Sequence, residues 1–286
     1  MLSHIRRSVD ADAAICGRIM HRAFRGIAEI HGFTPDIATD EAGIGLASVL
    51  IGSPTAYGVV AETDEQVVGS NFLLEGDPIW GLGPITVDPP HQGRRIGRRL
   101  MEAVLEHARE AEGVRLAGDA FNTRSIPLYA SLGFAVKEPL LLMRGRCRSE
   151  PLPGTAVRPL ASTDLDDCAQ LCAAIHGVPR TTELRNALAA FKPFVVERNG
   201  RVVGYLSAAN AWVMNHGVAE TASDMTSLLA GASAASGEIS FLLPVRQHDL
   251  FQWCVAQGLQ AQKPMLLMAL GTYHEPKGAW FPSVFY

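Results

Sequence analysis

The sequence predicts an α/β (α+β) protein built from two copies of one unit, each a mixed, mostly antiparallel sheet flanked by helices. An internal repeat and the alternation of strand-like with helix-like segments support this prediction. The chain has 286 residues, which is enough for two domains of ordinary size. With 48% hydrophobic and 19% charged residues it can bury a core, so a disordered chain is excluded.

Three pairs of similar segments form the repeat. They are IRRSVDAD (5–12) with VRPLASTD (157–164), VVAETDEQVVG (59–69) with VVERNGRVVG (195–204), and PLLLMRG (139–145) with PMLLMALG (264–271). Their offsets fall from 152 to 135 and then to 125 residues, so the second copy lacks 17 residues before its first hairpin and 10 after it. We therefore expect domains at 1–146 and 155–271, a linker at 147–154, and a tail at 272–286 that docks through its aromatic side chains.

Within the first copy, each element follows from its own hydrophobic pattern. We expect a strand near 4–7, helices near 10–30 and 38–52, a hairpin of 57–62 and 67–74, a strand at 79–87, a helix from 96, a strand at 114–121, a short helix at 124–132, and two strands within 134–146. In the helix from 96, Ile96, Leu100, Val104 and Ala108 form one apolar stripe.

The most informative stretch is VDPPHQGRRIGRRL (87–100), in which a strand leads through a glycine-containing loop into an amphipathic helix. Such a turn directs backbone N–H groups at one point, and the N-terminus of the helix adds partial positive charge. Arg94, Arg95, Arg98 and Arg99 lie in the same turn. The stretch suits a diphosphate, although the arginines would also pair with Glu102 or Glu106 at a solvated helix start.

This stretch resembles the diphosphate signature Q/R-x-x-G-x-G/A of the GNAT superfamily of acyl-CoA-dependent N-acyltransferases, matching it at Gln92 and Gly97. A second stretch, NTRSIPLYASLGF (122–134), is similar to the family's N…LY…GF pattern. Arg95 departs from the first pattern, which has glycine there. The resemblance covers nearly all of residues 3–146 and implies a GNAT-like fold with acetyl-CoA as co-substrate. It places the cofactor against Ile85, Val87, Gln92, Gly93, Arg94, Arg95, Ile96, Gly97, Arg98 and Asn122.

The strand expected at 79–87 supports a cofactor groove independently. Gly81, Gly83 and Pro84 are poor residues for a central strand and indicate a bulge where pairing opens. In the family the fourth and fifth strands splay apart here. By resemblance, the backbone of Ile85 and Val87 would pair with the pantetheine arm.

Acyl transfer to an amine needs a neutral nucleophile, a stabilised oxyanion and a protonated leaving thiolate. The resemblance nominates Tyr129 as the acid that protonates the thiolate. Glu75, Asp119 and His91 are alternative bases, and Asp119 could equally bind the ammonium of the substrate. Neither a Ser-His-Asp nor a Cys-His arrangement is indicated, so direct attack in a ternary complex is preferred.

The second copy is expected to have lost this chemistry. At an offset of 125, Tyr129 corresponds to Cys254 and Asn122 to Gln247, and GVAETASDM (217–225) lacks the diphosphate signature. We expect residues 155–271 to serve as a scaffold or pocket wall. The first copy's residues 20–50, which include His31, Phe33 and Asp36, are the region where the family recognises its acceptor.

The amino-acid composition limits the classes of binding partner that we expect for this protein. The net charge of −4 argues against nucleic acid, and no apolar run is long enough to span a membrane. The five cysteines are odd in number and lack metal-ligand spacing, so we expect a cytoplasmic enzyme without a metal. The leading hypothesis is an acetyl-CoA-dependent N-acetyltransferase that acts on a primary amine of a small molecule. The alternative is a non-catalytic acyl-CoA-binding or regulatory protein of the same fold. A homodimer is compatible with either function.

Overall fold

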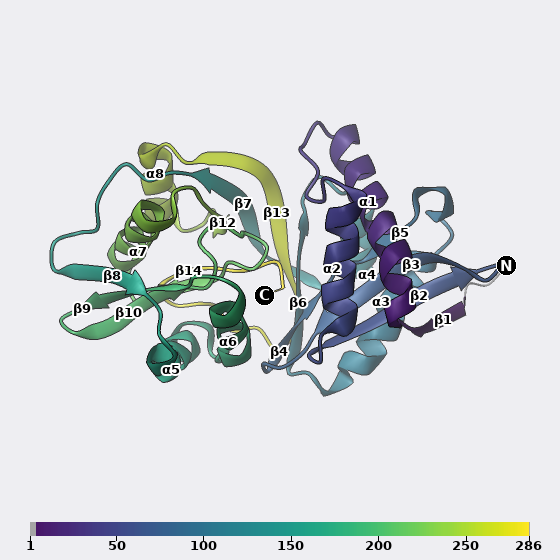
Figure 1. Ribbon diagram of the computed structural model, residues 1–286, viewed down its shortest axis with the longest axis horizontal. Helices are drawn as coiled ribbons and strands as arrows, with labels where there is room; N and C mark the ends of the chain where they lie inside the picture. Colours follow the sequence, from purple (N-terminus) through teal and green to yellow (C-terminus); the bar gives the residue numbers. More distant parts are fainter. Residues whose placement is uncertain (1–3, 286) are drawn as a thin grey trace.

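The computed structural model describes residues 4–285, which form two units of the same architecture lying side by side (Figure 1). The N-terminal unit contains β1 (His4–Arg7), α1 (Ala13–Ile30), α2 (Asp40–Gly52), β2 (Ala56–Thr63), β3 (Gln66–Leu74), β4 (Ile79–Leu82), β5 (Thr86–Val87), α3 (Ile96–His107), β6 (Gly113–Asp119), α4 (Ser125–Ser131) and β7 (Ala135–Gly145). The C-terminal unit contains β8 (Thr155–Pro159), α5 (Leu165–His176), α6 (Thr181–Ala190), β9 (Phe194–Arg198), β10 (Arg201–Leu206), β11 (Gly217–Ala219), α7 (Ala222–Ser236), β12 (Ile239–Pro244), α8 (His248–Gln257) and β13 (Gln260–Gly271), and β14 (Ala279–Phe281) follows in the tail. The matching order of elements confirms the predicted fold class and repeat.

An Arg–Asp–Glu triad fixes the start of the N-terminal unit. Arg6 donates hydrogen bonds to both carboxylate oxygens of Asp12, at 2.7 and 2.9 Å, and to Glu62 at 2.9 Å. Asp12 also accepts a hydrogen bond from the backbone N–H of Val9 at 2.9 Å. The triad therefore ties β1 to the beginning of the first helix and to the neighbouring strand β2.

The C-terminal unit repeats this triad with the same contacts. Arg158 donates to both oxygens of Asp164, at 2.7 and 2.9 Å, and to Glu197 at 3.0 Å. Arg158 and Asp164 follow their counterparts in the first copy by 152 residues, and Glu197 follows its counterpart by 135. These are the offsets that relate the two copies in the sequence. In both units the hydrogen bonds from the arginine lower the pKa of the aspartate below its usual value. At these three positions, the two copies thus share the same residue types and the same hydrogen bonds.

The two units exchange their last strands. The larger sheet has the order β1-β2-β3-β4-β6-β13-β7-β12, and the smaller has the order β14-β11-β10-β9-β8. β13 of the C-terminal unit therefore pairs with β6, while β7 of the N-terminal unit pairs with β12. Figure 1 shows β7 and β13 at the boundary between the units.

The prediction of two strands within 134–146 is wrong, because this stretch forms the single strand β7. Its neighbours are β13 on one side and β12 on the other, and both belong to the C-terminal unit. Both neighbours of β7 are thus supplied by the second copy.

Helices cover both faces of the N-terminal sheet. Cys16 and Met20 of α1 pack with Phe72 on one face, whereas Leu100 and Val104 of α3 pack on the other. The connection between α1 and α2 carries residues 31–39, the region expected to recognise the acceptor. No helix within residues 4–285 is both long enough and apolar enough to cross a membrane.

The crossing of α1 and α2 depends on glycine. A Cβ at Gly17 would lie 2.3 Å from the backbone of Ile44, so we expect Gly17→Ala to separate the helices and destabilise the fold by about 2–3 kcal/mol. Gly26→Ala is the control on the same helix, because a Cβ there meets no atom within 4 Å. It should be stabilising by about 0.5–1 kcal/mol. Urea unfolding measures both changes, and equal effects would contradict the packing argument.

Candidate active site

A gap opens in the N-terminal sheet where β4 and β6 separate. The two strands pair in parallel from Ile79 opposite Gly113 to Gly81 opposite Arg115. Beyond this point the chain passes Gly83 and enters β5, which pairs with β3. The pairing thus opens at the glycine- and proline-containing segment, as the sequence predicts.

The edge of β5 that faces the gap carries backbone groups that suit an extended ligand. The N–H of Asp88 donates to Val68 of β3, and Thr86 lies opposite Ser70 of β3. Because successive residues of a strand direct their N–H and C=O groups to opposite sides, those of Ile85 and Val87 face the gap. The Val87 carbonyl already accepts a hydrogen bond from the Gln92 side chain at 3.1 Å.

The loop before α3 has the backbone geometry of an anion cradle. Gly93 and Arg95 both have left-handed backbone angles, with φ of 78° and 62°, and α3 begins at Ile96. A Cβ at Gly97 would lie 3.6 Å from Leu128 and 3.9 Å from Val87. The glycine therefore leaves open the space between the helix start, α4 and β5. Helix N-termini with unpaired N–H groups of this kind attract phosphate.

The arginines of this loop lie at its surface. Arg94 and Arg95 are both exposed. Arg98 donates to the Ser131 hydroxyl at the end of α4, which ties the two helices together. Arg95 thus adopts a backbone conformation that normally favours glycine.

Tyr129 and Asn122 come from the segment that follows β6. Asn122 accepts a hydrogen bond from the backbone N–H of Ser125 at 3.3 Å, so its side chain caps the start of α4. Tyr129 is buried, and a Cβ at Gly118 of β6 would lie 3.9 Å from its ring. Burial raises the pKa of Tyr129 to about 12, so the phenol keeps its proton at neutral pH.

Asp119 ends β6 and meets two charged residues from elsewhere in the chain. Lys263 of β13 places its Nζ atom 2.6 Å from Asp119 and 2.6 Å from Asp36. The nearby ring of Phe121 stacks on Phe33 with centroids 4.4 Å apart. Burial raises the pKa of Asp119, and the negative charge of Asp119 contributes to the raised pKa of Tyr129. The charge of Asp119 thus acts on Tyr129, on the side of the gap formed by β6 and α4.

Glu75 belongs to a different part of the sheet. Its carboxylate lies 2.9 Å from Nε2 of His107 on α3. Leu74 lies opposite Gly81, the residue at which the gap opens. Glu75, the next residue of the chain, therefore lies on the closed side of that point. Asp119 lies four residues beyond that point along β6, about 13 Å away. The structure therefore brings Asp119 together with Tyr129 and keeps Glu75 apart from them.

Lys263 is the residue of this site that the sequence analysis missed. It is a charged residue inside a strand of otherwise largely apolar character, and its side chain is only 5% exposed. A charged residue among apolar ones is a signal that the sequence offers, but the contact of Lys263 with Asp119 depends on the exchange of strands between the units. Within residues 4–285 no three metal-binding side chains of the His, Cys, Asp or Glu type are clustered.

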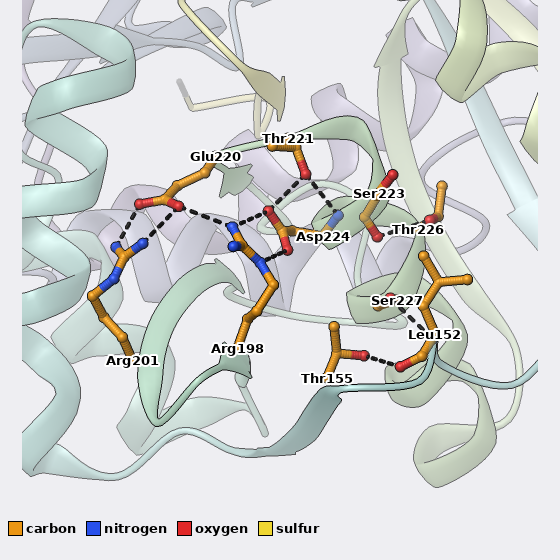
Figure 2. Close-up of polar contacts among 10 residues, drawn as sticks. All are labelled: Leu152, Thr155, Arg198, Arg201, Glu220, Thr221, Ser223, Asp224, Thr226 and Ser227. Carbon is orange, nitrogen blue, oxygen red and sulfur yellow. Dashed lines mark hydrogen bonds and ion pairs between the residues drawn. The ribbon is translucent and has the colours of Figure 1, made fainter.

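The matching loop of the C-terminal unit has a different chemistry (Figure 2). Only Glu220 and Thr221 separate β11 from α7, and Thr221 caps the helix by accepting from the N–H of Asp224 at 3.1 Å. Arg201 binds Glu220 at 2.9 Å, and Arg198 binds Asp224 at 3.0 Å. The carboxylates of Glu220 and Asp224 thus lie at the start of α7, in the place where the N-terminal unit has the open loop before α3.

The tail fills the corresponding gap in the C-terminal unit. Trp280 of β14 lies opposite Val218 of β11, and its backbone exchanges two hydrogen bonds with the side-chain amide of Gln247. The Phe281 ring packs against Phe241 of β12, with centroids 4.8 Å apart. The prediction that the tail docks onto a domain is confirmed, and its strand lies between β11 and β12.

Comparison with known proteins agrees with this geometry. Residues 19–134 match the family model described as Acetyltransferase (GNAT) family. Two proteins named mycothiol acetyltransferase are similar in part. The one from Nocardiopsis dassonvillei is 41% identical over 66 residues, 22% of this chain and 20% of that protein. The one from Nocardia farcinica is 33% identical over 134 residues, 44% and 42% of the two chains. The match thus spans less than half the length of these relatives.

Solved structures extend the likeness to the whole chain. An acetyltransferase structure from Pyrococcus horikoshii superposes with a TM-score of 0.77 at 14% identity, covering 99% of this chain and 94% of that one. A tandem GNAT protein from the clavulanic acid biosynthesis pathway gives a TM-score of 0.60 at 12% identity, with coverages of 94% and 98%. These likenesses show the fold. The chain therefore has a tandem GNAT fold. Within its N-terminal unit, residues 19–134 are similar to the GNAT family.

The left-handed backbone of Arg95 gives a testable stability effect. We expect Arg95→Gly to stabilise the fold by about 1 kcal/mol, because glycine adopts this conformation without a steric penalty. Arg94→Gly is the matched control, since it removes an equally exposed guanidinium at a residue whose φ is not left-handed. Urea unfolding of the two variants compares them. A gain in both would show that crowded positive charge, and not the backbone, is responsible.

Proposed function

We propose that the protein is an acetyl-CoA-dependent N-acetyltransferase whose N-terminal unit transfers an acetyl group to a primary amine of a small molecule. The observation that carries the proposal is the open gap between β5 and β6, with the cradle at Gln92–Gly97 at one end and the protonated phenol of Tyr129 beside it. The GNAT family match and the acetyltransferase names of the relatives support acetyl transfer in general.

The cofactor would be held mainly by backbone groups. The N–H groups from Gln92 to Gly97 would bind the diphosphate at the start of α3, with Ile96, Arg94, Arg95 and Arg98 adding hydrogen bonds or charge. The exposed edge at Ile85 and Val87 would pair with the amides of the pantetheine arm. Asn122, at the start of α4, would contact the same arm. This arrangement directs the thioester toward Tyr129.

The reaction then proceeds by direct attack in a ternary complex. The amine nitrogen forms a bond to the thioester carbon, and a backbone N–H at the gap stabilises the oxyanion. Collapse of the tetrahedral intermediate breaks the carbon–sulfur bond, and Tyr129 gives its proton to the leaving thiolate. A carboxylate accepts the proton that the nitrogen loses. Solvent exchange then returns both groups to their starting state.

Asp119 is the base that the geometry favours among the three candidates. It lies at the end of the strand that lines the gap, and its charge acts on Tyr129. Glu75 is engaged with His107 below the opening of the gap. His91 lies in the cradle loop, with its Nδ1 atom 3.8 Å from the Asp88 carboxylate.

Placement between the units supports a small acceptor. Lys263 and Trp212 of the C-terminal unit lie against Asp36 and Asp119 of the N-terminal unit. The C-terminal unit therefore borders the α1–α2 connection and the end of β6. A site enclosed from both sides favours a compact amine over an extended protein segment.

Thiol release from acetyl-CoA across a panel of small amines tests the activity. With an accepted amine, Tyr129→Phe should lower kcat by about 10²-fold and leave coenzyme A affinity nearly unchanged, because it removes the proton donor alone. Tyr57→Phe is the matched control, since Tyr57 stacks on His107 away from the gap. Coenzyme A binding without turnover of any amine would instead favour the non-catalytic alternative.

Calorimetry with coenzyme A tests the division of roles between the units. We expect one site per chain, because the N-terminal cradle is open whereas β14 fills the gap of the C-terminal unit and carboxylates occupy its helix start. Gly97→Leu should abolish this binding by placing a side chain in the space between the start of α3, Leu128 and Val87. Two sites per chain, or binding that survives Gly97→Leu, would contradict the assignment.

A further inference from the structure

Lys263 reaches the N-terminal site from the C-terminal unit. Its strand β13 pairs with β6, and Met265 lies opposite Asp119. The Nζ atom lies 2.6 Å from carboxylate oxygens of both Asp36 and Asp119, and the Trp212 ring centroid lies 5.1 Å away. The lysine therefore joins the α1–α2 connection, the end of β6 and a loop of the C-terminal unit.

A buried charge at this position also occurs in the first copy. Glu138 lies at the same place in the repeat, directly before a proline, and is buried in an ion pair with Arg246 at 2.9 Å. Each exchanged strand thus carries one charged anchor into the other unit. The anchors differ in their surroundings, because Lys263 contacts a carboxylate beside the cofactor gap whereas Glu138 pairs with an arginine of the C-terminal unit.

We propose that Lys263 is a positioning residue of the N-terminal active site, which holds the Asp119 carboxylate oriented and charged so that it accepts the proton of the acceptor amine. This inference rests on the proposed function. It assigns to the C-terminal unit a part in the reaction, through a residue that touches the base and not the substrate.

Four groups surround Asp119 from different elements. They are Lys263 on β13, Asp36 in the α1–α2 connection, His31 at the end of α1, and Tyr129 on α4. Burial raises the pKa of Asp119, Lys263 opposes this rise, and Asp36 adds to it. Removing Lys263 or Asp36 must therefore move the protonation of Asp119 in opposite directions. A loss of stability alone would lower activity without moving the pH profile, so the opposite shifts isolate the electrostatic effect on Asp119.

The experiment compares the pH dependence of kcat/KM in the full chain. Lys263→Met should move the acid limb to higher pH and lower kcat/KM on that limb about tenfold, whereas Asp36→Asn should move it to lower pH. Lys263→Arg, which keeps the charge, should restore most of the wild-type profile. Glu138→Gln is the matched control from the same repeat position and should reduce stability without moving the limb.

A second readout keeps this inference distinct from the proposed function. Carbon-13 NMR of labelled aspartate, assigned with Asp119→Asn, follows the protonation of Asp119 without any turnover. If wild type acetylates no amine, the proposed function fails while this titration still decides the role of Lys263. An unchanged Asp119 titration in Lys263→Met, or shifts of the same sign in Lys263→Met and Asp36→Asn, would overturn the proposal. If Lys263→Met does not fold, Asp36→Asn still decides the question, because an Asp119 titration that is unchanged or moved to higher pH in that variant would overturn the proposal.

Discussion

The pairing of β13 with β6 is the interaction on which the rest of the structure depends. Without β13, β6 would have an unpaired edge next to the cofactor gap. Without β7, β12 would likewise have an unpaired edge. Each unit therefore completes its central strands with backbone from the other. The boundary between the two units is therefore a continuous sheet, with further hydrogen bonds from Thr182 and Glu183 to Gly76 and Asp77.

This exchange explains how two similar units come to have different roles. In the C-terminal unit, β14 lies in the gap, Gln247 binds the backbone of Trp280, and Glu220 and Asp224 stand at the helix start. In the N-terminal unit the same places are open. The C-terminal unit contacts the N-terminal site through β13, whose Lys263 binds Asp119.

Much of the fold and part of the site could be predicted from the sequence. Hydrophobic periodicity and the repeat predicted the elements, and the loop at Gln92–Gly97 was recognisable because its glycines and helix start are adjacent in the chain. The strand exchange was not predictable, because the pattern of 135–145 is the same whichever unit supplies its neighbours. For that reason Lys263 was missed, and Glu75 could not be separated from Asp119. The left-handed backbone at Arg95 was equally hidden, since an arginine there gives no local signal.

The Arg158–Asp164–Glu197 triad has a consequence for which residues matter to folding. It persists in a unit that has no cradle, while Cys254 stands where the other unit has Tyr129. The molecule thus carries its own internal comparison: features shared by both halves mark the architectural requirements of the fold, and features confined to one half mark its chemistry. By this criterion Arg6, Asp12 and Glu62 belong to the architecture, and mutational studies of the reaction should pass them over.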